Sequence, residues 1–251
     1  MNKITHSDLN HEFINTLINK DNPIIFEVGA ADGNDSLVFL NNYKNIKLYC
    51  FEADPRAFTI HAKYINDDRC KLIGKAVSDI DGKVIFHLGN KDVDDPKLYK
   101  HQKWHNGKSD RYEVFKEANN IYNKIFNIYS ATSTENGWFY SSSMSNSIDW
   151  SPVIQKHSIT VDSIKLDSFC EQNNINNIDF LWTDVEASEK KVVNGAVNTL
   201  KFTKYLMLEF GLKYIFKEAM DKEETINLMK NYNFSPIKII ENNIIFKNDL
   251  L

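Results

Sequence analysis

Acidic residues and glycines gather in one stretch near the start of the chain, PIIFEVGAADGNDSLVFL. Glu27 precedes Gly29, Ala31 and Gly33, and Glu52 follows about twenty residues later, at the end of the next apolar run. A P-loop needs a Gly-Lys-Ser/Thr end and a dinucleotide fingerprint needs G-x-G-x-x-G, so this turn is neither. Glycines still let a backbone approach a ligand, and a strand-end carboxylate can accept both ribose hydroxyls. The spacing predicts a nucleoside-like ligand that is not held mainly by a pyrophosphate. The alternative is that these residues form only a tight turn beside a solvated carboxylate, with no ligand.

A second acidic group follows the apolar run IDFLWT. Asp184 and Glu186 stand where that run ends, and Glu189 opens the next segment. A carboxylate at a strand end can orient a hydroxyl and remove its proton, and His157 is another candidate base. Acidic residues also cap helices, which is the interpretation we favour for Glu189. The predicted catalytic residues are therefore Asp184, Glu186 and His157, and we expect no metal site because no complete ligand set can be chosen.

Aromatic and hydroxyl side chains in the middle of the chain are suited to binding a sugar. The stretch GWFYSSSMSNSIDW contains Trp138, Tyr140, Ser142 and Trp150. Aromatic rings provide flat apolar platforms for a sugar, while hydroxyls bond its edge. Packing of these rings against the domain is the alternative explanation. Glu209, which ends the run YLMLE, is a further candidate for contact with a substrate.

Apolar runs and amphipathic stretches alternate along most of the chain. Alternating strands and helices predict an α/β fold with a largely parallel sheet covered on both faces, and a closing hairpin around residues 242–243 adds an antiparallel edge. We also expect a hairpin through Asp81 and Gly82, and a helix capped by Asn34 or Asp35 whose apolar residues face the sheet. The expected strands are 24–28, 46–52, 71–78, 83–89, 178–185 and 204–210, and other expected helices are 11–18, 57–66, 164–174, 188–200 and 222–232.

Residues 91–157 break this alternation, because they are rich in Asn, Ser, Lys and aromatic residues. A connection of this length is uncommon in a compact domain unless it has a function. We expect one domain, residues 1–251, with an insertion at about 91–157 that covers the ligand side of the sheet. A disordered stretch is the alternative.

Composition narrows the function classes. The 251 residues carry a net charge of −4, which argues against a protein that mainly binds nucleic acid. Cys50, Cys70 and Cys170 are far apart in the sequence and form no C-x-x-C pair, so we expect neither disulfides nor a zinc knuckle, and a reducing, cytoplasmic setting. No run of about 18 apolar residues is present, so we expect no membrane insertion.

The motifs resemble the FkbM-type family of S-adenosylmethionine-dependent methyltransferases. The resemblance extends from IIFEVGAADGNDS and LYCFEADP through TVDSIKLDSF to IDFLWTDVEASEKKVVNGA and KYLMLEF. It implies a class I, Rossmann-like methyltransferase sheet with S-adenosylmethionine as the cofactor. The family usually has a glycine where this chain has Ala187, and often a lysine where it has Trp182 and Thr183. The positions implied to hold the cofactor are Glu27, Gly29, Ala31, Gly33, Glu52, Ala53, Ala76, Val77 and Ser78.

The resemblance implies methyl transfer to an oxygen, in a hydroxyl of a sugar, glycan or secondary metabolite. The ammonium group of S-adenosylmethionine and its lack of phosphate suit a turn that follows Glu27. Two other classes remain open. A NAD-dependent oxidoreductase shares the strand, turn and Glu52 but requires the missing middle glycine, and a non-catalytic binding module would bind the cofactor without turnover.

Overall fold

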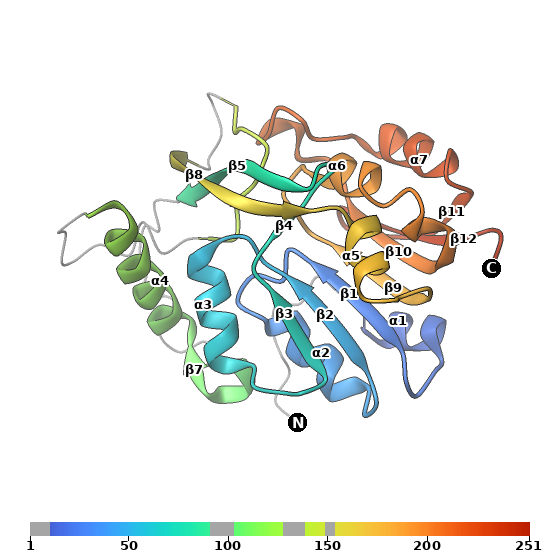
Figure 1. Ribbon diagram of the computed structural model, residues 1–251, viewed down its shortest axis with the longest axis horizontal. Helices are drawn as coiled ribbons and strands as arrows, with labels where there is room; N and C mark the ends of the chain where they lie inside the picture. The colour runs from blue at the N-terminus through green and yellow to red at the C-terminus, as the bar shows by residue number, and fades with distance from the viewer. Residues whose placement is uncertain (1–10, 91–102, 128–138, 149–153) are drawn as a thin grey trace.

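A seven-stranded sheet forms the centre of the protein (Figure 1). The computed structural model describes residues 11–90, 103–127, 139–148 and 154–251. The strand order is β11-β12-β10-β9-β1-β2-β3, in which β12 runs antiparallel to both of its neighbours and the other pairs are parallel. The mostly parallel sheet and its antiparallel hairpin are confirmed. The strands are β1 Ile24–Val28, β2 Lys47–Phe51, β3 Cys70–Ile73, β9 Ile178–Thr183, β10 Thr203–Glu209, β11 Phe234–Ile240 and β12 Asn243–Asn248.

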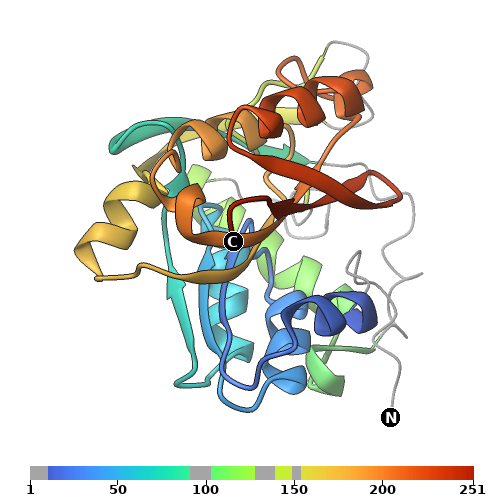
Figure 2. The same cartoon turned by 90° about the vertical axis from the view of Figure 1, so that its right-hand side faces the viewer.

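Helices cover both faces of this sheet, as expected for strands that are apolar on both sides (Figure 2). Alternate residues of a strand point to opposite faces. In β1, Ile25 packs into the layer of α1 and α2, whereas Phe26 packs edge-to-face on Phe169 of α5. Glu27 is next in this alternation and points to the α1–α2 layer. The helices of the two faces are α1 His11–Ile18 and α2 Asn34–Asn42 on one, and α5 Leu166–Gln172, α6 Glu189–Asn194 and α7 Lys222–Lys230 on the other.

The expected third strand, 71–78, is divided between two sheets. After β3, β4 (Ala76–Val77) joins a three-stranded sheet of order β4-β8-β5, with β8 at Ile154–Ile164 and β5 at Gly82–Asn90. Because β8 lies between β4 and β5, the predicted hairpin through Asp81 and Gly82 is wrong. The Asp81 carboxylate instead accepts hydrogen bonds from the backbone N–H of Lys165 (2.9 Å) and the hydroxyl of Ser168 (2.7 Å), which fixes this turn on the start of α5.

Two predicted helices differ in how they begin or end, whereas the ends of the other predicted helices lie within two residues of the observed ones. α2 begins at Asn34 with Gly33 as its N-cap residue, and the side chain of Asn34 donates to Asp32 at 2.9 Å instead of capping the helix. Its predicted inner face is confirmed, because Leu37 and Leu40 are buried. The helix predicted at 188–200 is shorter: α6 ends at Asn194, and a 3-10 helix, η4, follows at Thr199–Phe202.

Part of the expected insertion forms regular secondary structure. β6 (Lys103–Trp104) pairs with β7 (Ser109–Asp110) around the 3-10 helix η2 (His105–Gly107), and α4 (Arg111–Phe126) packs against α3 (Pro55–Tyr64). Residues 139–148 make β-bridges to His87 of β5 and to Phe216, just after the 3-10 helix η5 (Leu212–Tyr214). Trp138 and Trp150 lie outside the described residues. Across the described parts of the chain, no helix has the length and apolar character needed to span a membrane.

Gly195, the C-cap residue of α6, makes a close backbone contact with another element. An added Cβ at this glycine would lie 2.0 Å from the carbonyl oxygen of Ser78. The end of α6 therefore approaches the end of β4 closely, and only a residue without a side chain fits between them.

We predict that Gly195→Ala lowers the free energy of unfolding by about 3 kcal/mol, because the clash is with backbone that cannot rotate away. Gly107→Ala is the control: Gly107 has a φ of +84° but no atom within 4 Å of an added Cβ, so it should lose only about 1 kcal/mol from the left-handed conformation. Urea unfolding followed by circular dichroism measures both values. Equal losses would show that the Gly195 contact is not tight.

Candidate active site

A cavity of ≈ 320 Å³ lies beyond the carboxyl ends of β1, β2 and β9. Ligands of open α/β sheets bind at this edge. Its walls come from residues 28–32, 51–53, 75–77 and 184–186, together with side chains of the expected insertion. The predicted site residues that line it are Gly29, Ala31, Glu52, Ala53, Ala76, Val77, Tyr140, Ser142, Asp184 and Glu186.

The turn after β1 is wedged between its two neighbouring strands. The N–H groups of Gly29 and Ala30 both donate to the carbonyl of Phe51 at 3.0 Å, and the N–H of Asp184 donates to the carbonyl of Val28 at 2.9 Å. Gly29 has a φ of +88°, and an added Cβ would lie 1.8 Å from the carbonyl oxygen of Asp184. Only glycine fits this position, so the turn fixes the ends of β2 and β9 on its two sides.

Glu52 is a buried carboxylate at the cavity wall. Its two oxygens accept hydrogen bonds from the backbone N–H groups of Ala31 (2.7 Å) and Asp54 (2.6 Å). Burial raises the pKa of Glu52 to about 8, with a smaller contribution from the charge of Asp54, although the backbone hydrogen bonds oppose the shift. The side chain is therefore held rigidly between the turn and the start of α3.

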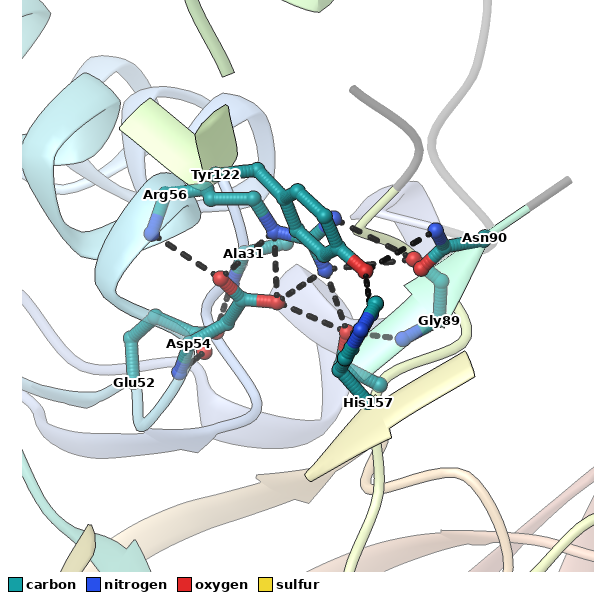
Figure 3. A network of polar contacts seen from close by, with 9 residues as sticks. Ala31, Glu52, Asp54, Arg56, Gly89, Asn90, Tyr122 and His157 are labelled. Atoms are coloured by element: carbon teal, nitrogen blue, oxygen red, sulfur yellow. Dashed lines mark hydrogen bonds and ion pairs between the residues drawn. The ribbon is translucent and has the colours of Figure 1, made fainter. Parts of the chain in front are cut away.

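A buried ion pair continues this network into the insertion (Figure 3). Asp54 caps α3 and pairs with Arg56 at 2.6 Å, with both side chains at most 1 % exposed. The Ser142 hydroxyl donates to Asp54 (2.7 Å) and accepts from Arg56 (3.0 Å) and from the N–H of Gly89 (2.9 Å). A hydroxyl has one proton and two lone pairs, so this network leaves Ser142 no capacity to bond a sugar. Ser142 instead fastens residues 139–148 to α3 and β5.

Asp32 is a second anchor for the insertion, and sequence reasoning missed it. Its buried carboxylate accepts hydrogen bonds from the Trp104 indole, the Tyr140 hydroxyl (3.0 Å) and the Asn34 amide (2.9 Å). The only signal in the sequence was an acid inside the glycine turn. Tyr140 is thus fixed with its ring at the cavity wall.

Arg111, which sequence reasoning also missed, brings a guanidinium to the same wall. It lies 4.9 Å from the ring centroid of Trp104 and 5.3 Å from that of Tyr140. Cations over aromatic faces are attracted by the ring quadrupole. Aromatic rings, a cation and carboxylates therefore share this cavity.

The loop after β9 carries the second acidic group in a constrained backbone. Glu186 and Ala187 have φ values of 51° and 69°, which accounts for the glycine that the resembling family has at the Ala187 position. The Ser143 hydroxyl donates to the carbonyl of Glu186 at 2.6 Å. Glu189 does not cap α6, since Ser188 is the N-cap residue; its carboxylate accepts from the N–H of Val185 at 3.3 Å, and burial raises its pKa to about 7.

Three predicted cofactor residues do not line the cavity. Glu27 faces the α1–α2 layer, where it accepts hydrogen bonds from Ser36 (2.5 Å) and Cys50 (3.3 Å), and burial raises its pKa well above the ordinary value. Gly33 is the N-cap residue of α2. The Ser78 hydroxyl donates to its neighbour Asp79. These three residues therefore lie behind the residues that form the cavity wall.

His157 and Glu209 are also absent from the cavity wall. On β8, His157 stacks on Phe126 with ring centroids 4.4 Å apart, and its Nδ1 atom is hydrogen-bonded to the hydroxyl of Tyr122 (Figure 3). Glu209 ends β10 and pairs with Asn243 of β12. Where the resembling family often has a lysine, Thr183 of this chain is buried and its hydroxyl donates to the carbonyl of Met207 at 3.0 Å.

Comparison with known proteins identifies the family of the chain. The family model described as "Methyltransferase FkbM domain" matches residues 27–236. The curated protein 2-O-methyltransferase NoeI from Sinorhizobium fredii is 24% identical over 223 residues, which are 88% of this chain and 77% of NoeI.

Among solved structures, the methyltransferase FkbM from Methylobacillus flagellatus is 9% identical with a TM-score of 0.46. The match covers 90% of this chain and 44% of that chain, so this chain spans less than half the length of the M. flagellatus protein. A putative rRNA methylase from Clostridium thermocellum is 8% identical with a TM-score of 0.44, over 96% of this chain and 95% of that chain. The family match covers most of the chain, and the chain belongs to the FkbM methyltransferase family, whose members use S-adenosylmethionine.

Proposed function

We propose that this methyltransferase methylates a hydroxyl of a sugar, as a small molecule or within a glycan. One observation carries the proposal: a single cavity has the buried Glu52 on one side of the glycine turn and the carboxylates of Asp184 and Glu186 on the other. The name of the relative NoeI, a 2-O-methyltransferase, supports an oxygen acceptor. The three free cysteines suit the reducing cytoplasm, where we place the reaction.

The donor side of the cavity fits a nucleoside. Glu52 would accept the ribose hydroxyls, and the turn at residues 29–31 offers backbone close to the ligand. Ala53, Ala76 and Val77 are small apolar residues that leave room for a flat base. S-adenosylmethionine supplies an electrophilic methyl group on its sulfonium. In this proposal Glu27, Gly33 and Ser78 shape the donor site without touching the donor.

Asp184 is our proposed general base. Methylation of a hydroxyl releases a proton, and a carboxylate within reach of that oxygen can take it as the new bond forms. The backbone of Asp184 is fixed by its hydrogen bond to Val28 and by the contact with Gly29, so its position does not depend on a flexible loop. Glu186 is the second candidate. His157 is not, because it does not line the cavity and its Nδ1 atom is bonded to Tyr122.

The acceptor side is formed by the insertion. Tyr140, Phe139 and Trp104 line the cavity and provide apolar ring surface for a sugar, while Arg111 provides hydrogen-bond donors. These contacts support the proposal that the insertion covers the active site. Trp138 and Trp150 stay in the proposal as acceptor residues, although they lie outside the described residues.

Methyl transfer from labelled S-adenosylmethionine to a panel of nucleotide sugars, oligosaccharides and extracted glycans tests the proposed function. We expect label in a sugar, at an alkali-stable ether. Labelling confined to amines or carboxyl groups would contradict O-methylation, and cofactor binding without any label transfer would favour a binding module.

Thermal denaturation separates the donor classes. S-adenosylhomocysteine should raise the melting temperature, because a ligand that binds only the folded state stabilises it, and NAD should not. The reverse order would contradict the assignment of the donor site.

At pH 9, above the pKa of about 8 that burial gives Glu52, we expect Glu52→Gln to weaken S-adenosylhomocysteine binding by about 1.5–3 kcal/mol, the usual contribution of hydrogen bonds to a charged group. Glu189→Gln is the matched control, because Glu189 is also a buried carboxylate bonded to backbone N–H but does not line the cavity. Isothermal titration calorimetry gives both affinities. If the two variants bind equally well, Glu52 does not hold the donor.

Asp184→Asn should keep the donor affinity but lower the methyl-transfer rate by roughly 10²- to 10⁴-fold, because asparagine cannot take a proton. His157→Gln should leave the rate unchanged. Single-turnover kinetics with the acceptor found in the screen measures both. If Asp184→Asn keeps the full rate and Glu186→Gln abolishes it, Glu186 is the base.

A further inference from the structure

Cys50, His61 and Cys70 meet behind the donor site, although they are far apart in the sequence and come from different elements. Cys50 lies on β2, Cys70 begins β3, and His61 lies in the last turn of α3. The two Sγ atoms are 3.5 Å apart, and the Cys70 Sγ is 3.9 Å from the His61 Nε2 atom. All three donor atoms lie within 4.8 Å of one another.

These separations match those of ligands around one tetrahedral zinc ion. Zinc binds thiolate sulfur at about 2.3 Å and imidazole nitrogen at about 2.0–2.1 Å, so tetrahedral ligand atoms lie about 3.6–3.8 Å apart. The observed distances of 3.5 and 3.9 Å differ from this by a few tenths of an ångström. The Cys50 Sγ atom and the His61 ring nitrogen lie within 4.8 Å of each other, so all three separations fall within about 1 Å of the tetrahedral spacing.

The register of the strands argues against a disulfide between the two cysteines. In the parallel pair β2–β3, Cys50 is opposite Leu72 and Cys70 is opposite Leu48, so the cysteines are diagonal neighbours. Diagonal neighbours in a sheet are about 7–8 Å apart, beyond the usual Cα separation of a disulfide. An ion, which lies between its ligands, spans this distance where an S–S bond does not.

The surroundings suit a soft cation. Cys50 and His61 are buried, whereas Cys70 is half-buried and gives the site an opening to solvent. The Cys50 Sγ atom also donates a hydrogen bond to the carboxyl group of Glu27 at 3.3 Å. Two sulfurs and an imidazole favour zinc or Cu(I) over magnesium or calcium, which prefer oxygen.

We propose that Cys50, His61 and Cys70 bind one zinc ion, with water at the fourth position. Each thiol releases its proton as it binds the ion. The ion ties β2 and β3 to the end of α3. Because Glu52 follows two residues after Cys50, and Asp54 caps the start of α3, the site reinforces the wall of the donor cavity from behind.

Zinc titration of the reduced, metal-stripped full chain against a chromophoric chelator tests this proposal. We expect one equivalent of zinc per chain, and the Cys70→Ser and His61→Gln variants should bind at least about 100-fold more weakly, since loss of a ligand costs more than loss of an outer-shell partner. Cys170→Ser is the control, because this buried cysteine lies on α5 in another part of the core. Cobalt(II) should give the visible bands of a tetrahedral thiolate site in the wild type and in Cys170→Ser.

Folding of each variant is checked by circular dichroism, and Cys70→Ser is the most conservative change because Cys70 is half-buried. The proposal is overturned if the wild type binds no zinc at micromolar concentrations, or if Cys70→Ser and His61→Gln bind it as tightly as the wild type. Zinc binding that is lost equally in Cys170→Ser would also overturn it. None of these readouts depends on methyl transfer.

Discussion

The contact between Gly29 and the carbonyl of Asp184 governs the arrangement of the active site. A methyl group at Gly29 would lie 1.8 Å from that oxygen, so the turn after β1 touches the end of β9 through backbone alone. The same turn donates two N–H groups to Phe51 at the end of β2. Three neighbouring parallel strands are thereby locked at their carboxyl ends. Glu52 directly follows Phe51, and Asp184 itself makes the contact with Gly29, so the positions of both residues are consequences of the turn.

The insertion is attached to this edge by carboxylates rather than by apolar packing alone. Asp32 binds Trp104 and Tyr140, and Asp54 binds Ser142 and its ion-pair partner Arg56. Buried charges are costly unless they are paired and hydrogen-bonded, and each of these carboxylates has several partners. The cavity wall that we propose to bind the acceptor is consequently held by residues of the turns that we propose to bind the donor. This coupling links the position of the acceptor to the integrity of the donor site.

The order of the elements could be predicted because apolar periodicity is strong in β1, β2, β9 and β10. The division of residues 71–78 between two sheets could not be predicted, because β8, the strand that pairs with β4, is more than 70 residues away in the sequence. The cavity-lining residues Gly29, Glu52 and Asp184 were predictable, since turn spacing and strand ends define that edge of the sheet.

Three of the predicted site residues, Glu27, His157 and Ser142, use their polar atoms in contacts with other protein groups, for identifiable physical reasons. Alternate residues of a strand point to opposite faces, so Glu27 of β1 points away from the cavity. This direction could have been predicted from the alternation in the sequence. His157 and Ser142 use their polar atoms on Tyr122 and Asp54, and such long-range hydrogen bonds leave no mark in a single sequence. The meeting of Cys50, His61 and Cys70 also depends on register and helix packing. Chemistry carried by several elements is thus visible only after folding.

A crystal structure of the complex with S-adenosylhomocysteine tests the central claim most directly. We expect the ribose hydroxyls within hydrogen-bond distance of the Glu52 carboxylate, with the sulfur atom on the Asp184 side of the turn at residues 29–31. A ligand with its ribose away from Glu52, or with its sulfur remote from Asp184, would contradict it.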